Sequence, residues 1–338
     1  MVTISDVARH AGVAPSTVSY VLTGKRSISA DTKSKVRGSI RALGYQPHLG
    51  DRAPSARGTN VIGLVLPLRA GMHLPVVMRF VAAAVTAARR FDLDLLLMTA
   101  DEGASGLRRA VAGAMVDGFL VMDVEMNDDR LPLLRQLSKP SVLIGHPVDA
   151  KGLTCVDFDF EAAGAKCVDH LADLGHRSIG FVGAPSAVYR RNTGFAHRTM
   201  AGFSAAAMRR GVVATTLPAE HDHDSVLAAT TTLIRANPSM TALVVHNEAA
   251  LGWITGCLRA AGRQVPGDVA VVAICPDDLA EQMTPPLTSV RLPAGELGRH
   301  AVNLLVAKLD GRQPPALMLL PPQLSRRAST PDPAAPTR

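Results

Sequence analysis

Short apolar runs alternate with longer amphipathic stretches from Val61 onward, and this alternation constrains the fold more than any other feature of the chain. Val61–Leu66 is rich in β-branched residues and too short for a buried helix, and an amphipathic stretch over 76–90 follows it. Further runs at 93–98, 118–122 and 141–144 alternate with predicted helices at 105–114 and 129–137. Strands that alternate with helices are typical of a doubly wound parallel sheet.

The pattern restarts after Asp159, which predicts a second half of the same α/β type. Its predicted helices and strands alternate as before, at 161–174, 178–182, 198–210, 212–217, 224–236, 242–246, 248–261 and 269–274. A run at 287–292 precedes a predicted helix over 294–309 and a last strand near 317–320. From Ser325 the chain holds Pro, Ala, Ser and Thr without apolar periodicity, so we expect a disordered tail.

The first 22 residues predict two short helices around a tight turn. Thr3 is placed to cap the first helix, with Asp6 three residues further on, and Gly12 supplies the turn. Pro15 suits the first position of the second helix, and a third helix is expected from about Ala30 to Leu43. Two helices joined by a short turn that contains glycine form a helix-turn-helix, whose second helix lies in the major groove of DNA.

Positive charge is concentrated in residues 1–59. This segment holds nine basic and three acidic side chains, so it carries +6 of the chain's formal net charge of +7. The remaining residues hold 27 basic and 26 acidic side chains and are nearly neutral. A small helical domain with a solvated basic surface would have the same charge. The helix-turn-helix spacing favours the other interpretation, a module that binds the phosphate backbone of DNA.

Length and composition bound the remaining choices. A chain of 338 residues is too long for one ordinary core and predicts two or three domains. It has no run of eighteen apolar residues and no apolar segment in its polar, basic N-terminus, so we expect neither a membrane span nor a secretory signal. The widely spaced Cys155, Cys167, Cys257 and Cys275 are expected to be reduced thiols of a cytoplasmic protein.

Several segments carry a resemblance to a known family, and they occur in that family's order. Near the N-terminus they are Thr3-Ile-Ser-Asp-Val-Ala-Arg, Ala11-Gly-Val-Ala, Thr17-Val-Ser and Gly44-Tyr-Gln-Pro. Further along they are Val61-Ile-Gly-Leu-Val, Val116-Asp-Gly-Phe, Leu174-Gly-His-Arg-Ser-Ile-Gly-Phe, Val265-Pro-Gly-Asp-Val and Thr284-Pro-Pro-Leu-Thr-Ser-Val. On these motifs the chain resembles the lactose-repressor (LacI/GalR) family of bacterial transcription factors, to about residue 324.

The resemblance implies a DNA-binding headpiece, a hinge and a two-lobed core like that of periplasmic binding proteins. The implied segments are a helix-turn-helix headpiece at 1–46, a hinge at 47–59, an N-terminal lobe at 60–156 and 293–324, a C-terminal lobe at 157–292, and the tail at 325–338. The implied partners are a pseudo-palindromic operator in double-stranded DNA, a small-molecule effector, and a second copy of the chain in a homodimer or higher oligomer.

The resemblance also assigns residues to DNA binding. Pro15, Ser16 and Tyr20 occupy the positions that the family uses to read base edges. Thr17 and Ser19 are candidates to hold phosphates, with helix capping as an equally good alternative. Thr3 at a helix N-terminus is a further phosphate candidate, and Arg52 in the hinge matches the family's pattern.

The hinge otherwise departs from the family, whose short hinge helix places a leucine in the minor groove. His48 stands for the usual asparagine, Asp51 for alanine and Pro54 for that leucine. Gly50 and Pro54 both weaken a short helix, and an acidic Asp51 is unfavourable beside phosphates. We therefore expect this hinge to contribute less to DNA affinity than is usual in the family, with Leu49 as the nearest apolar substitute.

The effector is expected in the cleft between the lobes, beyond the carboxyl ends of the strands. The candidate residues on those loops are Arg69, Met72, Asp101, Tyr189, Arg190, Arg198, His246, Asn247 and Cys275, with Glu248 directly after the pair 246–247. Sugar-binding members typically carry an aspartate where this chain has Cys275, which is equally explained as a small apolar filler. Arg69, Arg190 and Arg198 instead favour an anionic metabolite over a neutral sugar.

Two further classes were weighed against this interpretation. His221-Asp-His-Asp224 resembles a metal cluster, but adjacent residues alternate in direction, so Asp224 is better explained as the cap of the next helix; we expect no metal and no cofactor. The sequence has no glycine-rich dinucleotide or phosphate loop and no nucleophile elbow, so we do not expect an enzyme. The expected function is a sequence-specific transcriptional regulator, most simply a repressor. A regulator that has lost its effector response is the alternative.

Overall fold

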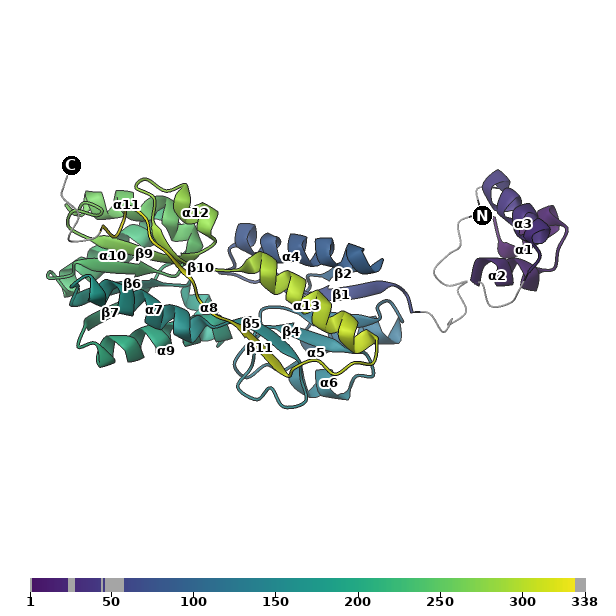
Figure 1. Cartoon of the computed structure of the whole chain (residues 1–338), viewed down its shortest axis with the longest axis horizontal. Coiled ribbons are helices and arrows are strands. Elements are labelled where there is room, and N and C mark those ends of the chain that lie inside the picture. The colour runs from purple at the N-terminus through teal and green to yellow at the C-terminus, as the bar shows by residue number, and fades with distance from the viewer. Residues whose placement is uncertain (1, 24–27, 44, 46–57, 332–338) are drawn as a thin grey trace. The chain divides into compact units, whose positions relative to one another are not determined.

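The computed structural model describes residues 2–23, 28–43, 45 and 58–331. The chain divides into two compact units, Met1–Thr59 and Asn60–Arg338, and each is described by itself (Figure 1). The hinge residues singled out above, from His48 to Pro54 and including Arg52, lie outside the described residues. Among the described helices, none combines the length and the apolar character needed to cross a membrane.

The first unit is a three-helix module made of α1 (Ile4–Ala11), α2 (Pro15–Thr23) and α3 (Ala30–Leu43). Thr3 and Asp6 form the predicted capping box: the Asp6 amide donates to the Thr3 hydroxyl at 3.3 Å, and the Thr3 amide donates to the Asp6 carboxylate at 2.9 Å. Gly12 ends α1 with a φ of 65°, a conformation that glycine adopts without strain. The predicted helix-turn-helix is therefore confirmed.

A small apolar core holds these three helices together. Val7 and Ala8 from α1, Val18 from α2 and Val36 from α3 are buried together with Tyr45. Each helix thus turns its apolar stripe inward and leaves its polar face exposed, which is the arrangement that a helical period of 3.6 predicts.

The second unit contains two six-stranded, mainly parallel sheets. The N-terminal lobe has the strand order β11-β5-β4-β3-β1-β2, and the C-terminal lobe has β12-β10-β9-β8-β6-β7. The strands of the first sheet are β1 (Val61–Val65), β2 (Asp94–Met98), β3 (Gly118–Val121), β4 (Ser141–Ile144), β5 (Cys155–Phe158) and β11 (Leu317–Leu320). Those of the second are β6 (Ser178–Gly183), β7 (Val213–Pro218), β8 (Ala242–Val245), β9 (Ala270–Cys275), β10 (Thr288–Arg291) and β12 (Leu324–Ser325).

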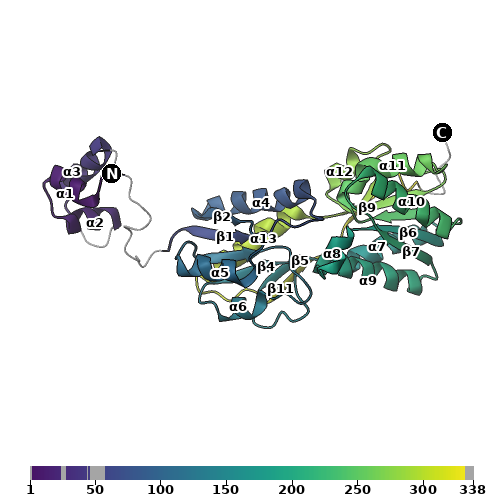
Figure 2. The same ribbon diagram turned by 180° about the vertical axis from the view of Figure 1, so that it is seen from behind.

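Helices cover both faces of each sheet, as the alternation of strands and helices predicts. In the N-terminal lobe, α4 (Leu74–Ala88) and α13 (Ala294–Leu309) lie side by side on one face, and α5 (Gly103–Ala112) and α6 (Leu131–Gln136) cover the other (Figures 1 and 2). The strands are buried on both sides, which explains why they are continuous apolar runs without polar alternation.

The C-terminal lobe repeats this layering. Helices α7 (Phe160–Asp173) and α9 (Gly194–Arg209) pack on one face of its sheet, and α10 (His223–Ala236) and α11 (Leu251–Ala260) pack on the other. The two short helices α8 (Ser186–Arg190) and α12 (Asp277–Glu281) follow β6 and β9, beside the junction of the lobes (Figure 2). Sequence patterns did not predict these two helices or strand β5, because each is too short to show a period.

The chain crosses between the lobes three times, after β5, after β10 and between β11 and β12. The third crossing corrects the prediction of a disordered tail from Ser325. Residues 325–331 are ordered on the C-terminal lobe, where Ser325 pairs with Ser289. Ser329 is fully buried: its hydroxyl donates to the Val271 carbonyl at 2.6 Å and accepts from the Thr288 amide at 2.8 Å.

The physical reason for this error lies in the serine and threonine side chains. Their polarity suggested solvent exposure, but their hydroxyls satisfy backbone groups at the sheet edge. Thr330 likewise bonds Thr288 at 2.6 Å and His170 at 3.0 Å. Residues 332–338 of the predicted tail lie outside the described residues.

Candidate functional sites

Helix α2 presents the residues that the sequence assigned to base reading. Pro15 and Ser16 are exposed, Tyr20 is half-buried, and Val18 between them is fully buried against the other helices. Thr17 and Ser19 are also half-buried. The exposed face of α2 is thus short and uncharged, so it suits direct contact with base edges better than attraction to phosphates.

The Thr3 hydroxyl has a structural role in the same unit. It donates to the Asp6 carboxylate at 2.7 Å and accepts from the Asp6 amide, so both functions of the hydroxyl are in use. The neighbouring carboxylate would also repel a phosphate. The basic side chains of α3, among them Lys33, Arg37 and Arg41, are exposed and better suited to phosphate contact.

A cavity of about 150 Å³ lies between the two lobes of the second unit, and we call it the interlobe cavity. It lies beyond the carboxyl ends of strands from both sheets: Leu66 follows β1, Met122 follows β3, Ala184 follows β6 and His246 follows β8. In a doubly wound fold this is the edge where ligands bind. The predicted position of the effector cleft therefore contains a real cavity.

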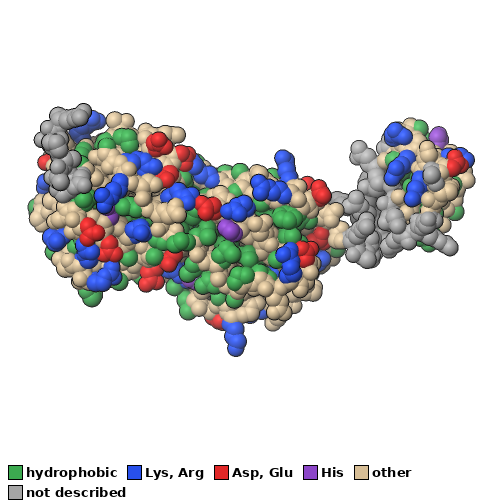
Figure 3. Space-filling view, in the orientation of Figure 1, with side chains coloured by type: hydrophobic (Ala, Val, Ile, Leu, Met, Phe, Trp, Pro, Cys, Tyr) green, Lys and Arg blue, Asp and Glu red, His purple; other side chains and the backbone are tan. Residues whose placement is uncertain are grey.

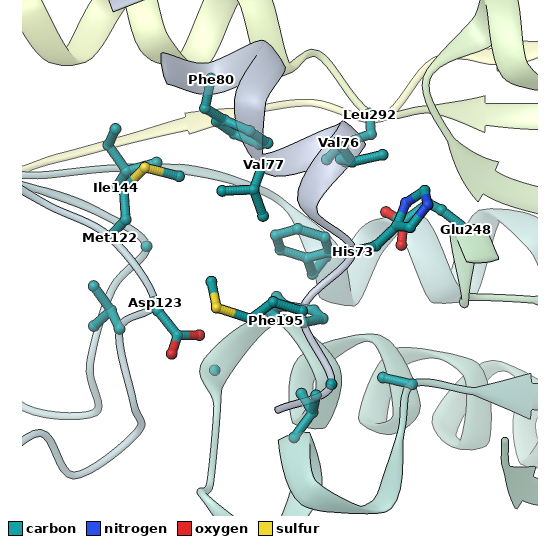
Figure 4. Close-up of a pocket in the computed structure, with 18 of the residues that line it drawn as sticks. His73, Val76, Val77, Phe80, Met122, Asp123, Ile144, Phe195, Glu248 and Leu292 are labelled. Carbon is teal, nitrogen blue, oxygen red and sulfur yellow. The ribbon is translucent and has the colours of Figure 1, made fainter. Parts of the chain in front are cut away.

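Apolar side chains form most of the cavity wall. Figure 4 shows Val76, Val77 and Phe80 projecting from α4, with Met122, Ile144, Phe195 and Leu292 around them. Phe160, Phe195 and His246 form a continuous aromatic wall, with ring centroids between 5.6 and 5.9 Å apart. Such a wall favours a flat or apolar ligand body.

At one end of the cavity, cations and carboxylates occur together, and we call this the charged end. Arg191 donates to the Ala70 carbonyl at 2.7 Å, and its Nε lies 4.0 Å from Asp123. Arg198 lies beside Asp157, which also pairs with His146 at 2.9 Å. Burial lowers the pKa of Arg198, and the carboxylates of Asp157 and Glu161 oppose that shift.

At the other end lie His73, His246, Asn247 and Glu248, which we call the acceptor end. Figure 4 shows His73, from the start of α4, beside Glu248 of the other lobe. Burial lowers the pKa of His246 to about 4 and also lowers the pKa of His73, so both imidazoles are neutral at pH 7. Burial raises the pKa of Glu248 to about 7.

The structure brings together four of the nine predicted effector residues. Met72, Arg198, His246 and Asn247 line the cavity. The other five lie elsewhere. Asp101 borders a separate pocket beside β2, Arg190 is exposed, Cys275 is fully buried in the core, the half-buried Tyr189 packs edge-on against His197, and Arg69 lies outside the cavity lining. Cys275 therefore fits the alternative of a small apolar filler.

The argument for an anionic effector loses most of its basis. It assumed that three arginines face few carboxylates, and this is wrong for Arg69, which contacts Asp101 at 2.7 Å, Asp123 at 3.2 Å and Glu125 at 2.6 Å. Arg190 points away from the cavity lining, and Arg191 takes its place there.

The suspected metal cluster does not assemble. His221 lines the interlobe cavity edge-on to His73, whereas the exposed His223 contacts Asp224. The cap of α10 is Asp222, whose carboxylate accepts from the Ser225 amide at 2.8 Å, so the assignment of the cap to Asp224 was wrong. Among the described residues, no group of His, Cys, Asp or Glu is arranged to hold a metal ion.

Direct contacts close the lobes around the cavity. The Gly194 amide donates to the Val124 carbonyl at 3.0 Å, and the Met126 amide donates to the Asn192 carbonyl at 2.8 Å. Arg79 of α4 forms two hydrogen bonds with Asp278 of α12, at 2.6 and 2.7 Å. This conformation is therefore a closed one.

The sequence interpretation missed several cavity residues, and some of them could have been found. Asp123 and His146 directly follow strands β3 and β4, so a uniform search beyond the strand ends would have included both. Phe160 and Phe195 come from helix starts, where an aromatic residue is equally consistent with a core position. His73 precedes a helix whose boundary was predicted three residues too late.

Comparison with known proteins gives a consistent result over nearly the whole chain. Residues 3–48 match the family described as bacterial regulatory proteins, lacI family, and residues 168–330 match the periplasmic binding protein-like domain. The transcriptional regulator CelR of Thermobifida fusca is 30% identical over 326 residues, which cover 91% of this chain and 92% of CelR.

Two solved structures extend the comparison. A complex of the regulator CelR with cellobiose has a TM-score of 0.68 and 28% identity, and the match covers 97% of this chain and 100% of that one. The lac repressor dimer bound to operator and the anti-inducer ONPF has a TM-score of 0.81. That match covers 97% of this chain and 99% of the repressor, and at 23% identity it shows the fold alone.

Proposed function

Because the chain belongs to the lacI family of bacterial regulatory proteins, and is a DNA-binding transcriptional regulator, we propose that it acts as a repressor whose affinity for DNA is set by a small molecule in the interlobe cavity. The observation that carries this proposal is the cavity itself, because both lobes supply its walls. A ligand between two lobes can change their relative position, and a ligand that binds one arrangement more tightly shifts the equilibrium toward it.

The proposed effector site is tested by filling the cavity. Val77 points into it from α4, whereas Thr86 lies on the exposed face of the same helix (Figure 4). Ligands found by thermal shift of the full chain should lose binding in Val77→Trp and keep it in Thr86→Trp. If Val77→Trp folds and still responds to every ligand, the effector site is elsewhere. If the parent chain responds to no ligand in a broad metabolite panel, the alternative of a regulator without effector response replaces this proposal.

For DNA recognition we propose that residues 1–46 read the operator through Pro15, Ser16 and Tyr20, with Thr17, Ser19 and Arg52 as further contacts. Selection from random DNA should return pseudo-palindromic sites. Each lost base contact should cost roughly 1–3 kcal/mol of discrimination at one base pair. Tyr20→Ala is the decisive variant: a base preference unchanged from the parent would show that the recognition face is placed wrongly.

We propose that the repressor is a homodimer and that the edge of the N-terminal sheet takes part in its interface. Strand β2 is an edge strand, and large apolar side chains are exposed around it: Leu74, Met78, Phe91, Leu97 and Met115. Monomers rarely expose such patches without a partner. Leu97→Lys should weaken the dimer in sedimentation experiments, and Met208→Lys, an exposed apolar site on the other lobe, serves as the control.

The activity is regulatory in this proposal, with no catalytic step, and its place of action is the cytoplasm, where the operator DNA lies. Acidic and basic side chains are intermixed over the visible face of the core in Figure 3, in keeping with its near-zero net charge. Attraction to DNA is therefore assigned to the basic headpiece, and the core is left to bind the effector and the second copy.

A further inference from the structure

The acceptor end of the interlobe cavity carries an inference about the chemistry of the effector, and this inference rests on the function proposed above. Three buried polar atoms there have no hydrogen-bond partner among the described residues: His73 Nδ1, His246 Nδ1 and Asn247 Oδ1. Buried polar groups in folded proteins are almost always satisfied, so three in one place indicate a missing partner.

Asn247 fixes the kind of partner. Its side-chain amide Nδ2 donates to the Ala219 carbonyl at 2.7 Å, so the unsatisfied atom is the oxygen, which only accepts hydrogen bonds. The residue is 2% exposed, so bulk water does not supply the missing donor. The ligand must therefore bring at least one donor to this position.

The histidines and Glu248 extend the same demand. A neutral imidazole keeps one nitrogen as an acceptor, and both His73 and His246 are neutral at pH 7. The Glu248 carboxylate has no ion-pair partner among the described residues, and its own backbone amide is the one hydrogen bond that affects its titration. Arg191 and Arg198, the cavity's two arginines, are at the charged end beside Asp123 and Asp157.

We propose that the effector is a one-ring molecule with a cationic amino group, which binds at Glu248, Asn247, His246 and His73 while the ring fills the apolar part of the cavity. An ammonium group has three donors and a positive charge, which match several acceptors and one unpaired carboxylate. A carboxylate or phosphate group would bring further acceptors to an end that already lacks donors.

Size and shape limit the rest of the molecule. A cavity of 150 Å³ lined by apolar side chains holds about one benzene-sized ring. A disaccharide such as the cellobiose of the CelR complex is larger than this closed cavity. The faces of Phe160 and Phe195 lie beside His246, so the aromatic wall adds attraction for a cation near its rim.

Benzylamine, benzyl alcohol and benzoate test the proposal, because they share one ring and differ in charge. Each is titrated into the full-length protein by calorimetry at pH 7. We expect benzylamine to bind about tenfold to a hundredfold more tightly than benzyl alcohol, and benzoate to bind least. Equal affinity for the amine and the alcohol, or a preference for benzoate, would overturn the proposal.

Glu248→Gln isolates the carboxylate, and Glu281→Gln on the exposed face of α12 is the matched control. In Glu248→Gln the preference for benzylamine over benzyl alcohol should fall to about threefold or less; in Glu281→Gln it should not change. A preference that survives in a folded Glu248→Gln protein would contradict the assignment.

A second variant guards against misfolding of the first. His73→Lys places an amino group of the protein at the acceptor end, so it should abolish benzylamine binding and preserve that of benzyl alcohol. If both ring compounds bind equally well and Val77→Trp removes both, the effector site stands and the charge inference fails. If no ring compound binds, both proposals fail.

Discussion

The two lobes of the core share one architecture but treat the polar residues beyond their strands in opposite ways. In the N-terminal lobe these residues are paired: Arg69 contacts three carboxylates, and the buried Arg130 is bound to Asp128 through two hydrogen bonds at 2.6 and 2.9 Å. In the C-terminal lobe, His246, Asn247 and Glu248 lack such partners among the described residues. The first arrangement stabilises a lobe, and the second leaves hydrogen-bonding capacity for a ligand.

This difference shows why the position of a residue did not reveal its role. Arg69 and His246 both follow strands, and the sequence placed both in the effector site. Pairing depends on which side chains the fold brings together from distant segments, such as Arg69 with Glu125, and no local pattern contains that information. The predictions below test whether paired and unpaired groups behave as differently as the geometry requires.

The largest effect is expected at Arg130. Its guanidinium is 4% exposed, binds Asp128 and also donates to the Met122 and Asp123 carbonyls, so Arg130→Met leaves a buried carboxylate without its partner. We expect a loss of about 3–5 kcal/mol in the free energy of unfolding, measured by urea titration. Adding Asp128→Leu should restore part of the loss, because no isolated charge remains; a double variant as unstable as the sum of both singles would contradict this account.

Glu248 provides the opposite case, in which removing a charge stabilises the protein. The pKa of its carboxyl is about 7 in the folded chain and near 4.5 in the unfolded one, so the folded state holds the proton more tightly and loses stability as the pH rises between these values. Glu248→Gln stays neutral. It should therefore raise the free energy of unfolding at pH 8 by at most about 3 kcal/mol and change it little at pH 5.

Comparison of variant with parent is essential in that measurement, because His246 has the reverse pH dependence. The pKa of its imidazole is about 4 when folded and 6.5 when unfolded, so its contribution is lost as the pH falls from 6.5 toward 4. This term is common to both proteins and cancels in their difference. An equal stabilisation at pH 5 and pH 8 would show that Glu248 is not buried as the structure has it.

Most of the fold could be predicted from the sequence, because its elements are local and periodic. The apolar runs became strands within one or two residues, and the helix over 294–309 has the predicted bounds, since sheets buried on both faces require continuous apolar strands. The short β5 and the ordered segment 325–331 could not be predicted. Their stability comes from pairing with distant strands and, in the second case, from Ser329 beneath β9 and β10.

The site was less predictable than the fold, for a related reason. The rule that ligands bind beyond strand ends identified Met72, Arg198, His246 and Asn247. It did not say which loop residues are already satisfied, so it included Arg69 and Asp101, which bind each other. Nor did it predict that Glu248 remains unpaired, because this depends on the absence of a cation in the closed structure.

The headpiece offers a smaller test of a paired polar group. Thr3 and Asp6 satisfy each other's backbone amides at the start of α1. Thr3→Ala removes one half of this capping box and should cost about 1 kcal/mol of headpiece stability. The melting transition of the core should not move. If DNA affinity instead falls with no change in headpiece stability, Thr3 acts as a phosphate contact after all.

The smallest effect is expected where the two lobes meet at the surface. Arg79 and Asp278 form a well-aligned pair across the lobes, but their side chains are 36% and 52% exposed, so solvent and salt screen the attraction. Arg79→Ala should lower the free energy of unfolding by roughly 0.2–1 kcal/mol at low ionic strength, and this difference should disappear in concentrated salt. Urea titrations of parent and variant at both ionic strengths measure it. A larger loss that persists in salt would mean that this pair holds the cavity closed as firmly as Arg130 holds its own lobe, and the contrast between surface and buried pairs would have to be abandoned.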